Sequence, residues 1–218
     1  MVGALCVKVL GSNRVVGLLL PASHTPKADV EDARGLASTW GIRTFTVSID
    51  TVFSSLMRSL PPDLDRKIAQ ANAKARIRMV INYYFANSFN LAVAGTGDRS
   101  EDLIGYFTKY GDGGVDFLPI AHLYKTQVRE LGRHMGLPSH IVTKPASPQL
   151  WEGHKATDEI PIEYKKLDPI LFGLFDRKMS FEQVSARTGV KTEVIQEVFR
   201  LHAISGHKRT YPPMVRSW

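Results

Sequence analysis

The spacing of hydrophobic residues changes repeatedly along the first fifty residues. Segments 2–10 and 27–40 have apolar side chains at helical spacing, and a glycine follows or ends each of them. Segments 14–20 and 43–49 are rich in β-branched and large apolar residues, which is typical of buried strands. This alternation of helix and strand predicts a mostly parallel sheet covered by helices.

The pattern after residue 60 is mostly helical. A third strand is expected at 91–94, directly before a glycine-containing turn. Segment 144–161 has several prolines and little periodicity, so we expect a long loop, and such loops are often functional in compact enzymes. Helices are expected at 64–88, 101–110, 120–135, 163–175, 180–188 and 192–204.

Composition favours one globular domain. The 218 residues are 44% hydrophobic and 22% charged, and no apolar run is long enough to span a membrane. The net charge is +7, and because the basic excess is spread evenly, it fits phosphorylated small-molecule ligands better than a dedicated DNA-binding surface. Cys6 is the single cysteine, which excludes an internal disulfide and makes a reducing, cytoplasmic setting the default.

The segment Ala94–Glu101 is a candidate ligand-binding turn. It follows a predicted strand, and ligands of open α/β sheets bind at the carboxyl ends of strands. Thr96 offers a hydroxyl and Glu101 offers a carboxylate. A plain strand-to-helix turn, with Glu101 favourable at the helix N-terminus, explains this segment at least as well.

The segment 106–116 combines glycines with charged side chains. Lys109 can meet a phosphate as a point charge, and Asp112 and Asp116 can accept hydrogen bonds from sugar hydroxyls. A surface turn is the alternative. Segment 112–117 imitates the Ser-Gly-Gly-x-Asp-Ser loop that binds pyrophosphate, but it lacks both serines and a preceding strand, so we do not interpret it as that loop.

Three further basic positions could meet anions. Lys125 lies in a first helical turn, where a phosphate could contact it together with backbone donors, although an exposed surface lysine fits equally well. Arg76 lies on the long helix 64–88, whose broad apolar surface suggests a partner subunit, and such arginines are more often solvated or paired. The cluster 207–209 suits anion binding, with nucleic acid or simple solubility as alternatives.

The helical pair within 180–199 is similar to a helix-turn-helix, with a glycine in the turn. Glu193 and Glu197 on its second helix would repel DNA phosphates. Helical hairpins are also common packing units. DNA binding is therefore the less favoured interpretation.

Taken in order, these motifs closely resemble the ammonia-dependent NAD synthetases. The resemblance covers nearly the whole chain, and its segments are Asn72–Met79, Gly95–Glu101, Gly105–Asp116, Pro119–Val128, Lys144–Glu159 and His207–Arg209. It implies a homodimeric, Rossmann-like α/β fold of the adenine nucleotide α-hydrolase type, with C-terminal helices. It also implies that ATP and Mg²⁺ adenylate the nicotinate carboxylate of deamido-NAD, and that ammonia then displaces AMP to give NAD.

The resemblance further implies roles for single residues. The ATP contacts implied are Thr96, Lys125 and Ser147. The Mg²⁺ ligand implied is Glu101, and the catalytic candidates are Asp112 and Lys125. Deamido-NAD binding is implied for five residues, some of them across the dimer interface: Arg76, Lys109, Asp116, His207 and Lys208.

Two features depart from the family pattern. Segment Gly153–Glu159 reads Gly-His-Lys-Ala-Thr-Asp-Glu where the family often has Gly-Gln-Thr-Asp-Glu. The family's first strand and its Ser-Gly-Gly-x-Asp-Ser loop, which would hold the ATP phosphates, do not precede Met1. We therefore expect residues 1–218 to form a single NAD synthetase domain lacking these elements, with badly impaired activity. A non-catalytic dimeric dinucleotide-binding protein is the alternative.

Overall fold

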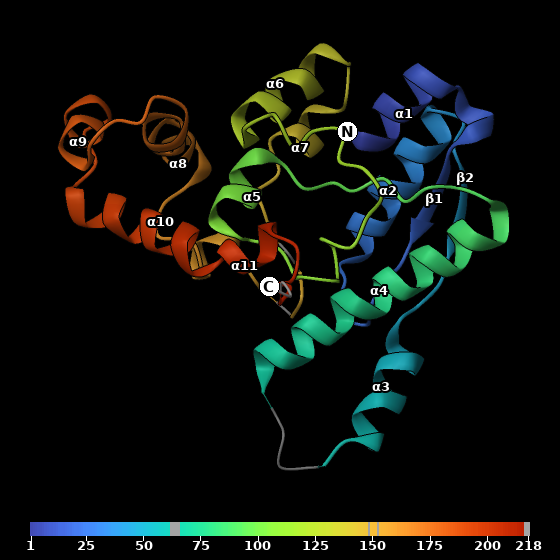
Figure 1. Cartoon of the computed structure of the whole chain (residues 1–218). Helices are drawn as coiled ribbons and strands as arrows, with labels where there is room; N and C mark the ends of the chain where they lie inside the picture. The colour runs from blue at the N-terminus through green and yellow to red at the C-terminus, as the bar shows by residue number, and fades with distance from the viewer. Residues whose placement is uncertain (62–65, 148, 152, 216–218) are drawn as a thin grey trace.

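The computed structural model describes residues 1–61, 66–147, 149–151 and 153–215. Its described part contains two neighbouring parallel strands, β1 (Val16–Leu19) and β2 (Arg43–Thr46). Helix α2 (Lys27–Thr39) connects them and packs against both, and α1 (Val2–Leu10) precedes β1 (Figure 1). The predicted order of helix, strand, helix and parallel strand is confirmed.

The predicted third strand at 91–94 is reduced, in the described structure, to one parallel bridge between Ala94 and Phe117. The N–H of Val93 donates to a carboxylate oxygen of Asp116 at 2.7 Å, where a strand would offer a backbone carbonyl. Because a side chain takes this donor, regular pairing does not extend along the segment. The prediction of a full strand here is wrong.

Helix α4 (Lys67–Phe89) crosses the molecule in front of the strands in Figure 1, and α3 (Asp50–Ser59) lies below it and packs against it. Helix α3 lies in a segment for which no helix was predicted. The predicted start of α4 at Leu64 lies outside the described residues. The far end of α4 packs on β2, where Phe45 lies 5.1 Å from Phe85 between ring centroids.

Helix α5 (Arg99–Ile104) is shorter than the predicted helix 101–110. Its start is stabilised by a capping box, in which Asp98 accepts from the N–H of Glu101 and Glu101 accepts from the N–H of Asp98. Its end is set by Gly105, whose φ of 69° is the left-handed conformation that glycine adopts most easily. The chain then turns, so the helix predicted through residue 110 is wrong in its second half.

Helix α6 (Lys125–His134) also begins later than predicted, because residues 120–124 form turns. Tyr124 is its N-cap residue, with extended φ and ψ. Gly136, with a φ of 72°, follows its end as expected, and the short helix α7 (Ser139–Val142) comes next. The predicted loop at 144–161 is confirmed in its described residues, with one 3₁₀ turn at Ala156–Asp158.

The C-terminal part is helical, as predicted. It comprises α8 (Tyr164–Leu171), a π-helical turn (Phe172–Asp176), α9 (Phe181–Thr188), α10 (Thr192–Ile204) and α11 (Gly206–Arg209). These helices enclose a hydrophobic core whose fully buried members are Leu167, Ile170, Leu171, Val184, Ile195 and Val198. The helix-turn-helix-like pair α9 and α10 thus contributes packing surface to this core. No helix in the described structure is long and apolar enough to cross a membrane.

Candidate functional site

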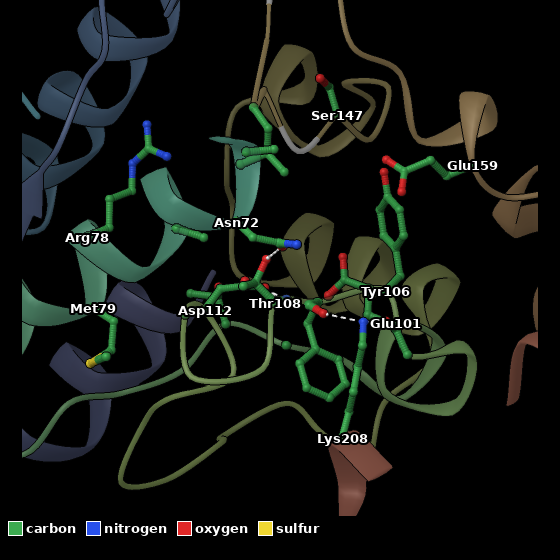
Figure 2. A pocket seen from close by; sticks show the side chains of 18 of the residues that line it. Asn72, Arg78, Met79, Glu101, Tyr106, Thr108, Asp112, Ser147, Glu159 and Lys208 are labelled. Atoms are coloured by element: carbon green, nitrogen blue, oxygen red, sulfur yellow. Dashed lines mark hydrogen bonds between the residues drawn. The ribbon is translucent and has the colours of Figure 1, made fainter. Parts of the chain in front are cut away.

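A cavity of about 770 Å³ lies where α4, the N-termini of α5 and α6, and the long loop meet (Figure 2). Leu18 and Leu20 at the carboxyl end of β1 line it, and so do Thr96 and Gly97 just after the Ala94 bridge. This is the position at which open α/β sheets bind ligands. The predicted site residues in its wall are Thr96, Glu101, Asp112, Lys125, Ser147 and Lys208.

One lysine and two carboxylates form the most strongly charged part of the wall. The Lys125 ammonium group lies 2.6 Å from Oδ2 of Asp98 and 2.6 Å from Oε1 of Glu101. The Asp98 side chain has no exposed surface, whereas Lys125 and Glu101 are each about one fifth exposed toward the cavity. Asp98 was not among the predicted site residues. Its signal was the Asp-x-x-Glu spacing of a capping box immediately after the glycine turn.

Burial sets the ionisation behaviour of this cluster. Loss of water around Asp98, together with the negative charge of Glu101, raises the pKa of Asp98 to about 6 against the opposing effect of Lys125. Burial lowers the pKa of Lys125, but attraction to Glu101 and Asp98 outweighs it and raises that pKa overall. Lys125 is therefore a permanently charged cation at neutral pH, with one face open to a ligand.

The first backbone donors of α6 are already used. The N–H of Lys125 donates to Oγ of Ser100 at 2.9 Å, and the N–H of Thr126 donates to Oδ2 of Asp168 at 2.8 Å. The sequence left open whether a phosphate contacts Lys125 together with backbone donors of this turn. In the structure these two amides already have acceptors, so the ammonium group is the donor that Lys125 offers to a ligand.

The turn after α5 also lines the cavity. The N–H of Thr108 donates to Asp112 at 2.9 Å, and the Thr108 hydroxyl donates to Oδ1 of Asn72 on α4 at 2.7 Å (Figure 2). Burial raises the pKa of Asp112, against the hydrogen bond from Thr108. Added at Gly111, a Cβ atom would come within 2.9 Å of Thr108, so this close packing requires glycine. Asn72 was not predicted as a site residue, although its segment was singled out.

Lys208 closes the cavity from the C-terminal side. Its ammonium group donates to the carbonyl oxygens of Gly105 and Phe107, each at 2.7 Å. Burial lowers its pKa, although the negative charges of Asp112 and Glu159 oppose the shift. Lys208 thus fastens α11 to the turn that carries Asp112, and it also brings a positive charge to the cavity wall.

The remaining implied residues are not among the described residues that line the cavity. Arg76 donates to the carbonyl oxygen of Lys109 at 3.3 Å, and the Lys109 ammonium group donates to the carbonyl oxygen of His207 at 2.5 Å. Arg76 and Lys109, held together with the His207 backbone, therefore form a basic group beside Lys208. Asp116 lies apart from them and accepts from the hydroxyl of Tyr83 at 3.0 Å.

The long loop contributes Ser147, Trp151 and Glu159 to the cavity wall. The Ser147 hydroxyl donates to the carbonyl oxygen of His154, and the buried His154 ring lies 2.7 Å from Glu159 and stacks on Trp151. The sequence departs from the resembling family at His154, and this residue now joins the two ends of the loop. Tyr106 and Glu159, which sequence reasoning missed, lie together on one side of the cavity (Figure 2).

Arg78 is another cavity residue that sequence reasoning did not assign. It reaches from α4 to the end of β1, where it donates to the carbonyl oxygen of Leu20 at 3.0 Å. Burial lowers its pKa. Its nearness to the strand end could not be read from the helix periodicity, because that pattern does not show which helix faces which strand.

Among the described residues, no cluster of three or more His, Cys, Asp or Glu side chains forms a metal cage. A magnesium ion does not need one, because it is commonly bound by one or two carboxylates together with substrate phosphates. Glu101 lines the cavity and has a partly exposed carboxylate beside Lys125. The site therefore fits a magnesium ion that enters with a polyphosphate.

A cavity at the carboxyl end of a parallel strand, with glycine turns and a lysine–carboxylate cluster in its wall, is typical of α/β enzymes that use nucleotides. The chain belongs to the NAD synthase family, because that family's model matches residues 1–212. It is 46% identical to the NH(3)-dependent NAD(+) synthetase of Staphylothermus marinus and 48% identical to that of Hyperthermus butylicus. Both alignments cover 96% of this chain, and they cover 77% and 76% of the relatives.

Solved structures support the same assignment. The structure titled NMN synthetase from Francisella tularensis has a TM-score of 0.85 at 30% identity, covering 99% of this chain and 83% of that one. An NH3-dependent NAD synthetase from Campylobacter jejuni has a TM-score of 0.80 at 25% identity, covering 97% and 82%. The predicted Rossmann-like α/β fold is confirmed.

Proposed function

We propose that the chain acts in NAD biosynthesis as an ammonia-dependent NAD synthetase. It would adenylate the nicotinate carboxylate of deamido-NAD with ATP, release pyrophosphate, and let ammonia displace AMP. The observation that carries this proposal is the charged cluster of Lys125, Glu101 and Asp98 in the cavity wall of a family member. A carboxylate becomes an electrophile for ammonia only when a good leaving group such as AMP is attached to it.

The chain's own residues would bind and orient ATP. The charged Lys125 ammonium group stabilises the negative charge that collects on departing pyrophosphate. Thr96 and Ser147 also line the cavity and would offer hydroxyl groups to the nucleotide. Glu101 would hold Mg²⁺, which supplies charge neutralisation for the phosphates when bound. Asp112, which also lines the cavity, would act near the reacting carboxylate.

The basic group beside Lys208 would hold deamido-NAD. Lys208 brings its charge to the cavity, Arg76 and Lys109 continue the positive surface outward, and His207 offers its imidazole beside them. Asp116 accepts hydrogen bonds now from Tyr83 and Val93, and it would accept from a sugar hydroxyl in the same way. These roles place both negatively charged dinucleotide phosphates near cations.

The proposal includes a homodimer in the cytoplasm, with no part for nucleic acid. Exposed apolar side chains on α3 and α4 support self-association, and they are Val52, Leu56, Val80 and Tyr84. The free thiol of Cys6 and the use of ATP agree with a reducing compartment. Sedimentation should give a dimer mass, which Val80→Arg should reduce to the monomer mass. A wild-type monomer at micromolar concentration would contradict this part.

The test is an assay of NAD and AMP formation from deamido-NAD, ATP, Mg²⁺ and ammonium. Glutamine replaces ammonium in one arm, and the nicotinate mononucleotide replaces deamido-NAD in another, because one structural neighbour is titled NMN synthetase. We expect ammonium and deamido-NAD to be the preferred pair. Preference for the mononucleotide would identify it, and not deamido-NAD, as the substrate. Deamido-NAD binding without turnover would favour the non-catalytic binding protein.

The printed sequence contains no Ser-Gly-Gly-x-Asp-Ser segment. We therefore propose to assay two proteins, the chain as printed and the same chain extended by a strand and such a loop. We expect the extension to raise the rate, because the loop's backbone donors would hold the ATP phosphates. Equal rates for the two folded proteins would show that the described cavity suffices.

A further inference from the structure

We propose that Asp168 is a positioning residue for ATP, which anchors the N-terminus of α6 to α5 and so sets where Lys125 meets Glu101. This inference rests on the proposed function. Asp168 touches no substrate, and ATP binding depends on this residue through Lys125.

The anchoring contacts come from three different helices. Asp168 lies on α8 and is buried, with 4% of its surface exposed. Its Oδ1 accepts from the hydroxyl of Ser100 on α5 at 2.6 Å, and its Oδ2 accepts from the N–H of Thr126 on α6 at 2.8 Å. Ser100 then accepts from the N–H of Lys125 at 2.9 Å. One carboxylate thus joins the first turns of the two helices that carry the charged cluster.

Physical chemistry explains why a carboxylate is found at this buried position. Both α5 and α6 direct their N-terminal turns at Asp168, and the partial positive charge of a helix N-terminus stabilises an anion. In the described structure, the N-cap residue of α6, Tyr124, makes no side-chain hydrogen bond to the helix. Asp168 and Ser100 therefore supply from other helices the acceptors that a local N-cap would usually provide.

The consequence for the site is a fixed distance between two charged side chains. Ser100 directly precedes Glu101, and it accepts from the backbone of Lys125. Movement of Ser100 would therefore shift both the lysine and the carboxylate that face the phosphates. A purely structural role for Asp168 would instead reduce the amount of folded protein and leave ligand affinities unchanged.

The test compares ligand affinities of variants by calorimetry. Asp168→Asn keeps the size of the side chain. Its NH₂ group cannot accept a hydrogen bond, so either the Ser100 hydroxyl or the Thr126 N–H loses its acceptor. Ser100→Ala removes the bridging hydroxyl and serves if the first variant does not fold. Ile170→Val, in the core on the same helix, is the control, since it loses packing but keeps the polar contacts. Each protein is titrated with ATP in the presence of Mg²⁺, and separately with deamido-NAD.

We expect Asp168→Asn to weaken ATP binding about tenfold, because small misplacements of binding groups are costly. Deamido-NAD affinity should stay within about twofold of wild type, and the control should bind both ligands normally. In a Lys125→Met background, Asp168→Asn should have no further effect on ATP affinity. Equal ATP affinity in wild type and Asp168→Asn, or additive effects in the double variant, would overturn the inference. If neither the chain as printed nor the chain with the added loop binds ATP, the inference and the proposed function both fail.

Discussion

The Lys125 ammonium group lies 2.6 Å from a carboxylate oxygen of Asp98 that is completely buried. A buried ion pair contributes little net stability, because both charges lose their hydration, but removing one partner leaves an unpaired charge. The pair therefore holds Lys125 in one place. The remaining surface of its ammonium group faces the cavity, beside Glu101.

Replacing this lysine should be the most damaging single change at the site. We expect Lys125→Met to lower kcat/KM for ATP by about 10²-fold or more, since one preorganised cationic donor is lost. Steady-state kinetics measure the effect. Lys155→Met removes an exposed lysine from the long loop and is the matched control. A similar loss in the control, or full activity of Lys125→Met, would remove Lys125 from the mechanism.

Asp98 should make stability depend on pH. Its pKa rises from 3.8 in water to about 6 in the folded chain, so the unfolded chain releases this proton at lower pH than the folded chain. The favourable contribution of Asp98 is thus complete below about pH 4 and is lost as the pH rises to about 6. The side chain in Asp98→Asn does not ionise. As the pH rises through this window, wild type should therefore lose on the order of 2 kcal/mol of unfolding free energy relative to Asp98→Asn.

Urea unfolding at about pH 4 and about pH 7 measures this difference, because the other titrating groups are shared by both proteins. A constant difference between the two proteins would mean that Asp98 ionises normally. A difference that changes in the opposite direction would mean that Lys125 dominates and lowers the Asp98 pKa.

The turn at Gly105 should tolerate no side chain. A Cβ atom there would lie 2.1 Å from Cβ of Ser205, and the φ of 69° is itself unfavourable for alanine. Gly189 has a φ of 68° with no atom within 4 Å of an added Cβ, so Gly189→Ala isolates the backbone strain. We expect Gly189→Ala to cost about 1 kcal/mol of unfolding free energy and Gly105→Ala about 3 kcal/mol or more. Equal costs would mean that Ser205 moves away freely.

Lys208 should affect both stability and dinucleotide binding. Lys208→Met leaves the carbonyl oxygens of Gly105 and Phe107 without their present donor, and it removes a positive charge from the cavity. We expect unfolding free energy to fall by about 1–2 kcal/mol and KM for deamido-NAD to rise about tenfold. Lys191→Met, at the exposed start of α10, is the control. An unchanged KM would leave Lys208 with its anchoring role alone.

The sequence allowed the parallel pair and the C-terminal helices to be predicted, because their hydrophobic periods are clear. The end of α5 and the start of α6 were predicted wrongly. The apolar spacing continues past both boundaries, but Gly105 ends α5 and the turns at 120–124 precede α6. The strand at 91–94 was also wrong. Its single bridge is made with Phe117, and the side chain of Asp116 accepts from the N–H of Val93, a contact between distant residues that no local pattern identifies.

The candidate site was predictable where a motif carried it. Glu101, Asp112 and Lys125 lie in short segments with glycines or helix starts, and the structure brings them to one cavity. Asp98 and Asp168 were missed for different reasons. Asp98 had only its capping role as a signal, and Asp168 lies on a helix whose facing partners no periodicity specifies.

The most direct test of the central claim is the joint measurement of AMP and NAD. Folded protein, as printed and with the added loop, is incubated with deamido-NAD, ATP, Mg²⁺ and ammonium, and both products are quantified. We predict that AMP and NAD form in equal amounts, only when ammonium is present, and that both are lost in Lys125→Met. Folded protein that yields no NAD in either form, or that yields AMP without NAD, would contradict it.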